Sequence, residues 1–128
     1  MIKQTFSVDG FWKVIVYYNV DYNFFDSIKW ELMVADISKE GIEEVWDTMS
    51  TGEAKAVTCS NVNRHISVVL FNSHTSEADY INSLVHEAEH VKQAMLQAYM
   101  VEDAGESSAY TVGYIVRRMY EVFKKLVQ

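Results

Sequence analysis

The stretch Leu84–Val91, which reads LVHEAEHV, lies in the middle of a long helical pattern. His86 and His90 are four residues apart, so on a helix they lie one above the other on the same face. Two imidazoles placed in this way can bind one metal ion between them, and Glu87 is close enough to contact a water there. The stretch therefore predicts a helix with a metal-binding face.

The helix around this stretch is expected to span residues 76–100. Its start resembles a capping box, Ser76-Glu77-Ala78-Asp79, with acids where the helix dipole favours them. Helical spacing predicts a core-facing stripe of Ile81, Leu84, Val85, Ala88, Val91, Met95 and Tyr99. The opposite face is polar, and it is either solvated or the floor of a wet cleft; its residues are Asp79, His86, His90, Gln93 and Gln97.

The residues before this helix predict a hairpin with strands over 54–60 and 65–72. The polar turn Asn61-Val62-Asn63-Arg64 separates the two strands. The run 66–71, ISVVLF, leads directly into the helix. A strand in this position can be a sheet edge against which an extended peptide pairs, although an ordinary core strand has the same pattern.

The N-terminal part of the chain predicts a second hairpin and two helices. Asp9-Gly10 is a turn signal between β-formers, so we expect a hairpin over residues 2–20. Its second arm is apolar on both faces and is expected to be covered on both sides. Helices are expected over residues 23–35 and from Ser38, a favoured N-cap residue, to Gly52.

The last expected helix spans about residues 106–127 and carries an apolar stripe of Val112, Ile115, Val116, Met119, Phe123 and Leu126. Together these elements predict an α+β fold, in which a small, mostly antiparallel sheet packs against helices. Its 128 residues favour one compact domain, residues 1–128.

Composition and charge narrow the range of partners. The formal net charge is −7 and the 11 basic residues form no long run, which argues against nucleic acid and anionic membranes as partners. We see no signal-peptide pattern and no apolar run long enough to span a membrane. Cys59 is the single cysteine, so no internal disulfide can form, and we expect a cytoplasmic location.

A catalytic zinc site needs a third protein ligand. From His90 to Tyr99 the helix would rise by roughly 13 Å. Residues 100–105, if extended, can return by up to roughly 20 Å, so Glu106 can reach the level of the histidines. Glu102 and Asp103 have too little chain to return unless the helix ends early. Glu106 is therefore our predicted third ligand.

Two further histidines, His65 and His74, are weaker candidates. His65 lies where a strand is expected to begin and His74 lies in the loop before the helix cap, so both are expected to be ordinary surface residues.

The motif His86-Glu87-Ala88-Glu89-His90 followed by Glu106 resembles the zincin metallopeptidases, and the downstream glutamate resembles the gluzincin branch with its thermolysin-like ligand set. The segment 105–110, GESSAY, is also similar to one in small bacterial and phage-borne gluzincin-like proteins. The resemblance covers residues 66–114. It implies a strand at the sheet edge, an active-site helix and a helix that carries the ligand glutamate.

The resemblance also implies a chemistry. His86, His90 and Glu106 would bind one Zn²⁺ per chain, and Glu87 would act as general base on the zinc-bound water in peptide-bond hydrolysis. Many gluzincins use a downstream histidine or tyrosine to stabilise the oxyanion. No histidine follows His90, so Tyr110 is the predicted catalytic residue, with Tyr114 in reserve. Both tyrosines also fit a simple packing role where the two helices cross.

The expected partner is a peptide or protein substrate. Because the chain is short, its cleft would be shallow, and a second copy or another protein could complete it. Two other functions stay open on the sequence: a zinc-stabilised binding module without catalysis, and a metal-free α+β interaction protein in which the motif is coincidental.

Overall fold

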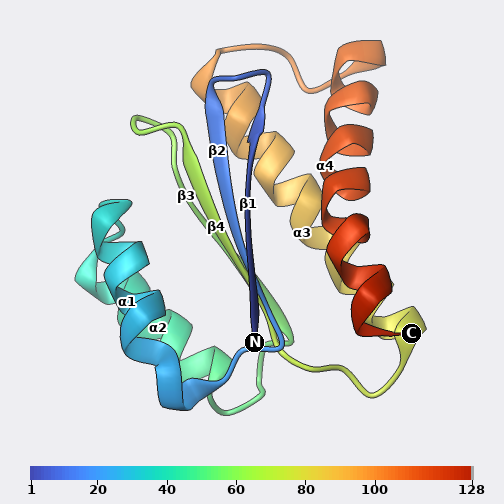
Figure 1. Ribbon diagram of the computed structural model, residues 1–128. Helices are drawn as coiled ribbons and strands as arrows, with labels where there is room; N and C mark the ends of the chain where they lie inside the picture. Colours follow the sequence, from blue (N-terminus) through green and yellow to red (C-terminus); the bar gives the residue numbers. More distant parts are fainter. Residues whose placement is uncertain (128) are drawn as a thin grey trace.

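A four-stranded sheet lies between two pairs of helices in the computed structural model, which describes residues 1–127 (Figure 1). The strands are β1 (Ile2–Val8), β2 (Trp12–Tyr18), β3 (Ala56–Asn61) and β4 (Ile66–Phe71). Their order is β1-β2-β4-β3. The β1–β2 and β3–β4 hairpins are antiparallel, whereas β2 and β4 are parallel. This arrangement confirms the expected α+β class.

Two helices follow β2 and cover one face of the sheet. They are α1 (Phe25–Val34), preceded by a short 3₁₀ helix (Tyr22–Phe24), and α2 (Lys39–Met49). The Ser38 hydroxyl accepts a hydrogen bond from the backbone N–H of Gly41 at 3.0 Å, which confirms Ser38 as the N-cap of α2. The connection from β2 to its parallel neighbour β4 thus runs through α1, α2 and β3.

The other two helices, α3 (Glu77–Ala98) and α4 (Gly105–Leu126), pack on the opposite face (Figure 1). Strand β2 contributes to both layers because successive side chains alternate in direction. Trp12, Val14, Val16 and Tyr18 pack with α3 and α4, while Ile15 and Tyr17 pack with α1 and α2. The expectation that this strand is covered on both sides is confirmed.

The hairpin turn between β1 and β2 and both ends of α3 have backbone conformations or hydrogen bonds that their residues favour. Asp9 (φ 54°) and Gly10 (φ 73°) both adopt the left-handed backbone that a two-residue hairpin turn needs. At the start of α3, the Ser76 hydroxyl accepts a hydrogen bond from the Asp79 N–H at 3.1 Å. Met100 (φ 55°) turns the chain beyond the other end, so α3 ends at Ala98, two residues before the predicted limit.

The buried side of α3 differs from the predicted stripe in several of its residues. Leu84, Ala88, Val91 and Met95 are buried as expected, but Ile81 and Val85 remain exposed. Tyr80 is buried instead, with its ring centroid 5.1 Å from that of Phe123 on α4.

The structure corrects the proposed role of residues 66–71. The resemblance implied that this run forms the sheet edge, but β4 lies inside the sheet between β2 and β3. Parallel pairing with β2 occupies the side of β4 that an edge strand would leave free. The edge strand on this side of the sheet is β3.

Within residues 1–127, the structure holds no helix with both the length and the apolar character that crossing a membrane requires.

The core-facing stripe of α3 can be tested by a matched pair of substitutions. Leu84 is 1 % exposed and Val85 is 46 % exposed. Leu84→Ala should lower the free energy of unfolding by about 2–5 kcal/mol, because it leaves a cavity between helix and sheet. Val85→Ala should change it by less than about 0.5 kcal/mol. Urea titration followed by circular dichroism measures both, and equal effects would contradict this packing.

Candidate metal centre

His86 and His90 lie together on the exposed side of α3. Their Nε2 atoms are 3.1 Å apart, and the ring planes are nearly perpendicular, at 80°. Two nitrogen ligands at 2.0–2.1 Å from a tetrahedral zinc are separated by about 3.3 Å. The pair therefore fits a zinc ion in both donor chemistry and spacing. The same distance suits an N–H···N hydrogen bond, which holds the rings in this arrangement without the metal.

Glu87 joins the two histidines. One ligand atom from each of the three side chains lies within 4.8 Å of the others, so the group could hold a metal ion. Unlike the histidines, Glu87 is buried, with 4 % of its surface exposed. Burial raises the pKa of its carboxyl group, since the charged form loses hydration. Positive charge on His90 or His86 and a hydrogen bond from Thr58 oppose this increase.

The Glu87 carboxylate points toward the edge strand of the sheet. Its Oε1 accepts a hydrogen bond from the Thr58 hydroxyl on β3 at 3.4 Å. Ser60, two residues further along β3, shares this face of the sheet and lies 2.7 Å from the hydroxyl of Ser67. Ser67 in turn accepts a hydrogen bond from the Trp12 indole at 3.0 Å. Polar side chains of β3 and β4 therefore lie on the same face of the sheet as Thr58, which contacts Glu87.

Helix α4 packs against a different flank of α3. The buried Lys92 ammonium lies 2.7 Å from Asp103 in the connection to α4, and 2.6 Å from Glu89. Asp103 also accepts a hydrogen bond from Ser108 on α4 at 2.6 Å. Lys92 is two residues after His90, so the two side chains leave the helix about 160° apart. The ion pairs thus hold the start of α4 far around α3 from the histidines.

The predicted third ligand, Glu106, lies in the first turn of α4 and is exposed. Within residues 1–127, the group that can hold a metal ion does not include it. Asp103 does return beside α3, because the helix ends early at Ala98, but its carboxylate pairs with Lys92. The role of Glu106 as a ligand stays a prediction, and it requires the start of α4 to move around α3.

Within residues 1–127, no hydrogen bond joins Tyr110 or Tyr114 to the group. Tyr110 is 74 % exposed on the outer side of α4. The Tyr114 hydroxyl donates to the Ser7 carbonyl at 3.3 Å and accepts from Arg118 at 2.9 Å. The small Gly113 does not serve a close approach of α4 to α3, because a Cβ added there would meet nothing within 4 Å. An oxyanion role for either tyrosine stays a prediction.

The other two histidines have packing roles. The ring nitrogens of His74 lie 2.7 Å from the Asn72 carbonyl and 2.7 Å from the Ser83 hydroxyl. His65 stacks on Trp12 with ring centroids 5.6 Å apart. Neither belongs to the group on α3.

Sequence reasoning missed Thr58 and Lys92. Thr58 has no local signal that links it to Glu87, because the contact depends on which strand lies beside α3. Lys92 is three residues after Glu89, so helical spacing could have predicted the ion pair between them. The ion pair between Lys92 and Asp103 depends on how the chain turns after α3.

In comparisons with known proteins, no protein-family model, no curated protein and no solved structure matches this chain. The resemblance to gluzincins therefore depends on the motif alone.

Zinc titration calorimetry tests which side chains hold the metal. His86→Ala should weaken zinc binding by more than about 100-fold, because it removes one of the two paired imidazoles. Glu106→Gln should leave the affinity within about twofold, since its carboxylate lies outside the group. If Glu106→Gln weakened zinc binding as much as His86→Ala does, that result would contradict this arrangement of α4.

Proposed function

We propose that this chain is a zinc-dependent hydrolase and that its substrate is a peptide bond. One observation carries the proposal: a buried carboxylate, Glu87, lies beside two paired imidazoles and faces the edge strand of the sheet. A structural metal site needs ligands only, whereas hydrolysis also needs a base held next to the reacting water.

His86 and His90 would hold the metal, and their Nε2 spacing of 3.1 Å suits that role. Zinc bound there would supply Lewis-acid polarisation of the substrate carbonyl and would acidify a water. Glu87 would take a proton from the water while the oxygen of that water attacks the carbonyl carbon of the peptide. It would then give that proton to the amine as the C–N bond breaks. A pKa raised by burial makes this carboxylate a better proton acceptor than an exposed one.

The free edge of β3 favours a peptide as substrate. Within residues 1–127, β3 pairs only with β4, so its other side is open to an added strand. An extended peptide that paired there would pass Thr58, whose hydroxyl contacts Glu87. Backbone hydrogen bonds would thus bring a peptide group close to the base without requiring a deep cleft.

A second function is favoured by the positions of Glu106 and Tyr110. Glu106 is not in the group with the histidines, and within residues 1–127 no hydrogen bond joins Tyr110 to that group. A zinc-binding module without catalysis needs no residue that stabilises an oxyanion, although its zinc would take further ligands from water or from a partner. It would bind zinc and a peptide strand but would not turn the peptide over. A metal-free interaction protein would bind no zinc at the motif.

Glu87→Gln separates catalysis from binding. We expect the variant to keep zinc affinity within about threefold and to lose at least about 100-fold in hydrolysis of a fluorogenic peptide library, because the amide cannot accept the proton. Glu89→Gln, two residues along the same helix, is the control and should retain activity.

Undiminished hydrolysis by Glu87→Gln would refute Glu87 as the base. A zinc-loaded wild-type protein that cleaves none of the peptides would refute the peptidase and support the binding module.

A further inference from the structure

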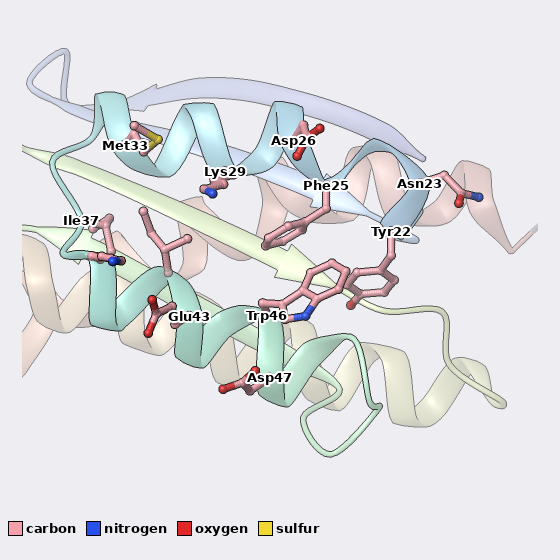
Figure 2. Close-up of a pocket in the computed structure, with 12 residues that line it drawn as sticks. Tyr22, Asn23, Phe25, Asp26, Lys29, Met33, Ile37, Glu43, Trp46 and Asp47 are labelled. Carbon is pink, nitrogen blue, oxygen red and sulfur yellow. The ribbon is translucent and has the colours of Figure 1, made fainter.

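A groove lies between α1 and α2, on the face of the sheet opposite α3 and the histidines (Figures 1 and 2). Its volume is about 910 Å³. Both walls are helices, and the four-residue connection 35–38 joins them, so they run side by side in opposite directions. None of the residues proposed for hydrolysis lines the groove.

The bottom of the groove is apolar and aromatic. Phe25 and Ile42 are buried at its base, whereas Trp46 is 42 % exposed. The rings of Tyr22, Phe25 and Trp46 contact one another, with centroids 4.9–6.1 Å apart. Such a continuous apolar surface, open to solvent, is typical of a site that another molecule covers.

Charges are distributed unevenly along the groove. At the aromatic end, Asp26 on α1 and Asp47 on α2 lie on opposite sides of the rings (Figure 2). Neither carboxylate forms an ion pair within the described residues 1–127. Further from this end the charges are mixed, because Lys29 and Lys39 line the groove there together with Glu43. A ligand that matches this pattern carries positive charge over the aromatic end.

The dimensions of the groove suit a helix. Helices α1 and α2 have 10 and 11 residues, so each wall is about 15–17 Å long. A partner helix of about three turns would span this length and place its apolar side chains between the two walls. A lysine or arginine of that helix would lie over the Trp46 ring, which attracts cations, and between the two carboxylates.

We propose that this groove binds a basic amphipathic helix of a partner protein. The apolar stripe of that helix would rest on Phe25, Ile42 and Trp46, and its basic end would lie between Asp26 and Asp47. Because the groove and the histidines lie on opposite faces of the sheet, the partner would leave the metal centre uncovered. This inference does not depend on the proposed hydrolase activity.

The probe is a synthetic helical peptide of about 15 residues, with leucines at helical spacing on one face and lysines elsewhere. Fluorescence anisotropy of the labelled peptide should show saturable binding to the wild-type protein. Trp46→Ala should weaken that binding by at least about tenfold, as expected for a central aromatic anchor. Trp30→Ala is the matched control, since Trp30 is 66 % exposed on α1 but does not line the groove, and its affinity should stay within about twofold.

A second variant covers the case in which Trp46→Ala loses its fold, as seen by circular dichroism. Asp26 and Asp47 are both exposed, so the double substitution Asp26→Lys and Asp47→Lys should keep the fold. The double substitution should weaken peptide binding by about tenfold or more, and the affinity should depend less on salt concentration. The reason is that it reverses the two charges that would face the lysines of the peptide.

Three results would overturn the proposal. The first is the absence of saturable binding, and the second is equal affinity for a peptide with glutamates in place of the lysines. The third is a wild-type protein that self-associates in sedimentation while Trp46→Ala stays monomeric, which would assign the groove to a second copy of this chain.

Discussion

The parallel pairing of β2 with β4 is the constraint on which the other features depend. It joins two antiparallel hairpins into one sheet, and it requires the chain to travel from one end of the sheet to the other between the two strands. Helices α1 and α2 make part of that connection and cover one face. The pairing also places β3 at the edge, so that α3 lies over an open strand.

The candidate centre follows from that placement. The Glu87 side chain is buried because it projects from α3 toward β3, where the Thr58 hydroxyl donates a hydrogen bond to it. A buried carboxylate is costly unless polar groups compensate it, and here a hydroxyl and two imidazoles do so. On the other flank of α3, Lys92 forms an ion pair with Asp103, which lies just before the start of α4. Helix α3 thus carries the candidate metal site on one side and the ion pair to the start of α4 on the other.

Local chemistry predicted most of the elements, because each depends on neighbours in the sequence. Asp9-Gly10 predicted a hairpin turn, and Ser38 and Ser76 predicted the starts of two helices. The helical spacing of apolar residues over 84–95 predicted a buried stripe. The sequence also brought His86, Glu87 and His90 together, since helical spacing alone places them.

Long-range placement was the part that local patterns could not predict. The run 66–71 has the same alternation in an edge strand as in an interior one, so its position depends on β2, which lies far away in the sequence. Glu106 has enough chain to reach the histidines, but the flank of α3 on which α4 packs depends on the buried apolar side chains that the two helices share and on the Lys92–Asp103 ion pair. Chain length limits what a residue can reach, whereas packing decides where it lies.

We propose that His86 and His90 together bind one zinc ion beside Glu87. The most direct measurement is X-ray absorption at the zinc edge on protein loaded with one equivalent of zinc. We expect two imidazole nitrogens at about 2.0–2.1 Å from the zinc, with oxygen atoms as the remaining ligands. A spectrum without imidazole, a sulfur ligand from Cys59, or failure of the protein to retain zinc would contradict it.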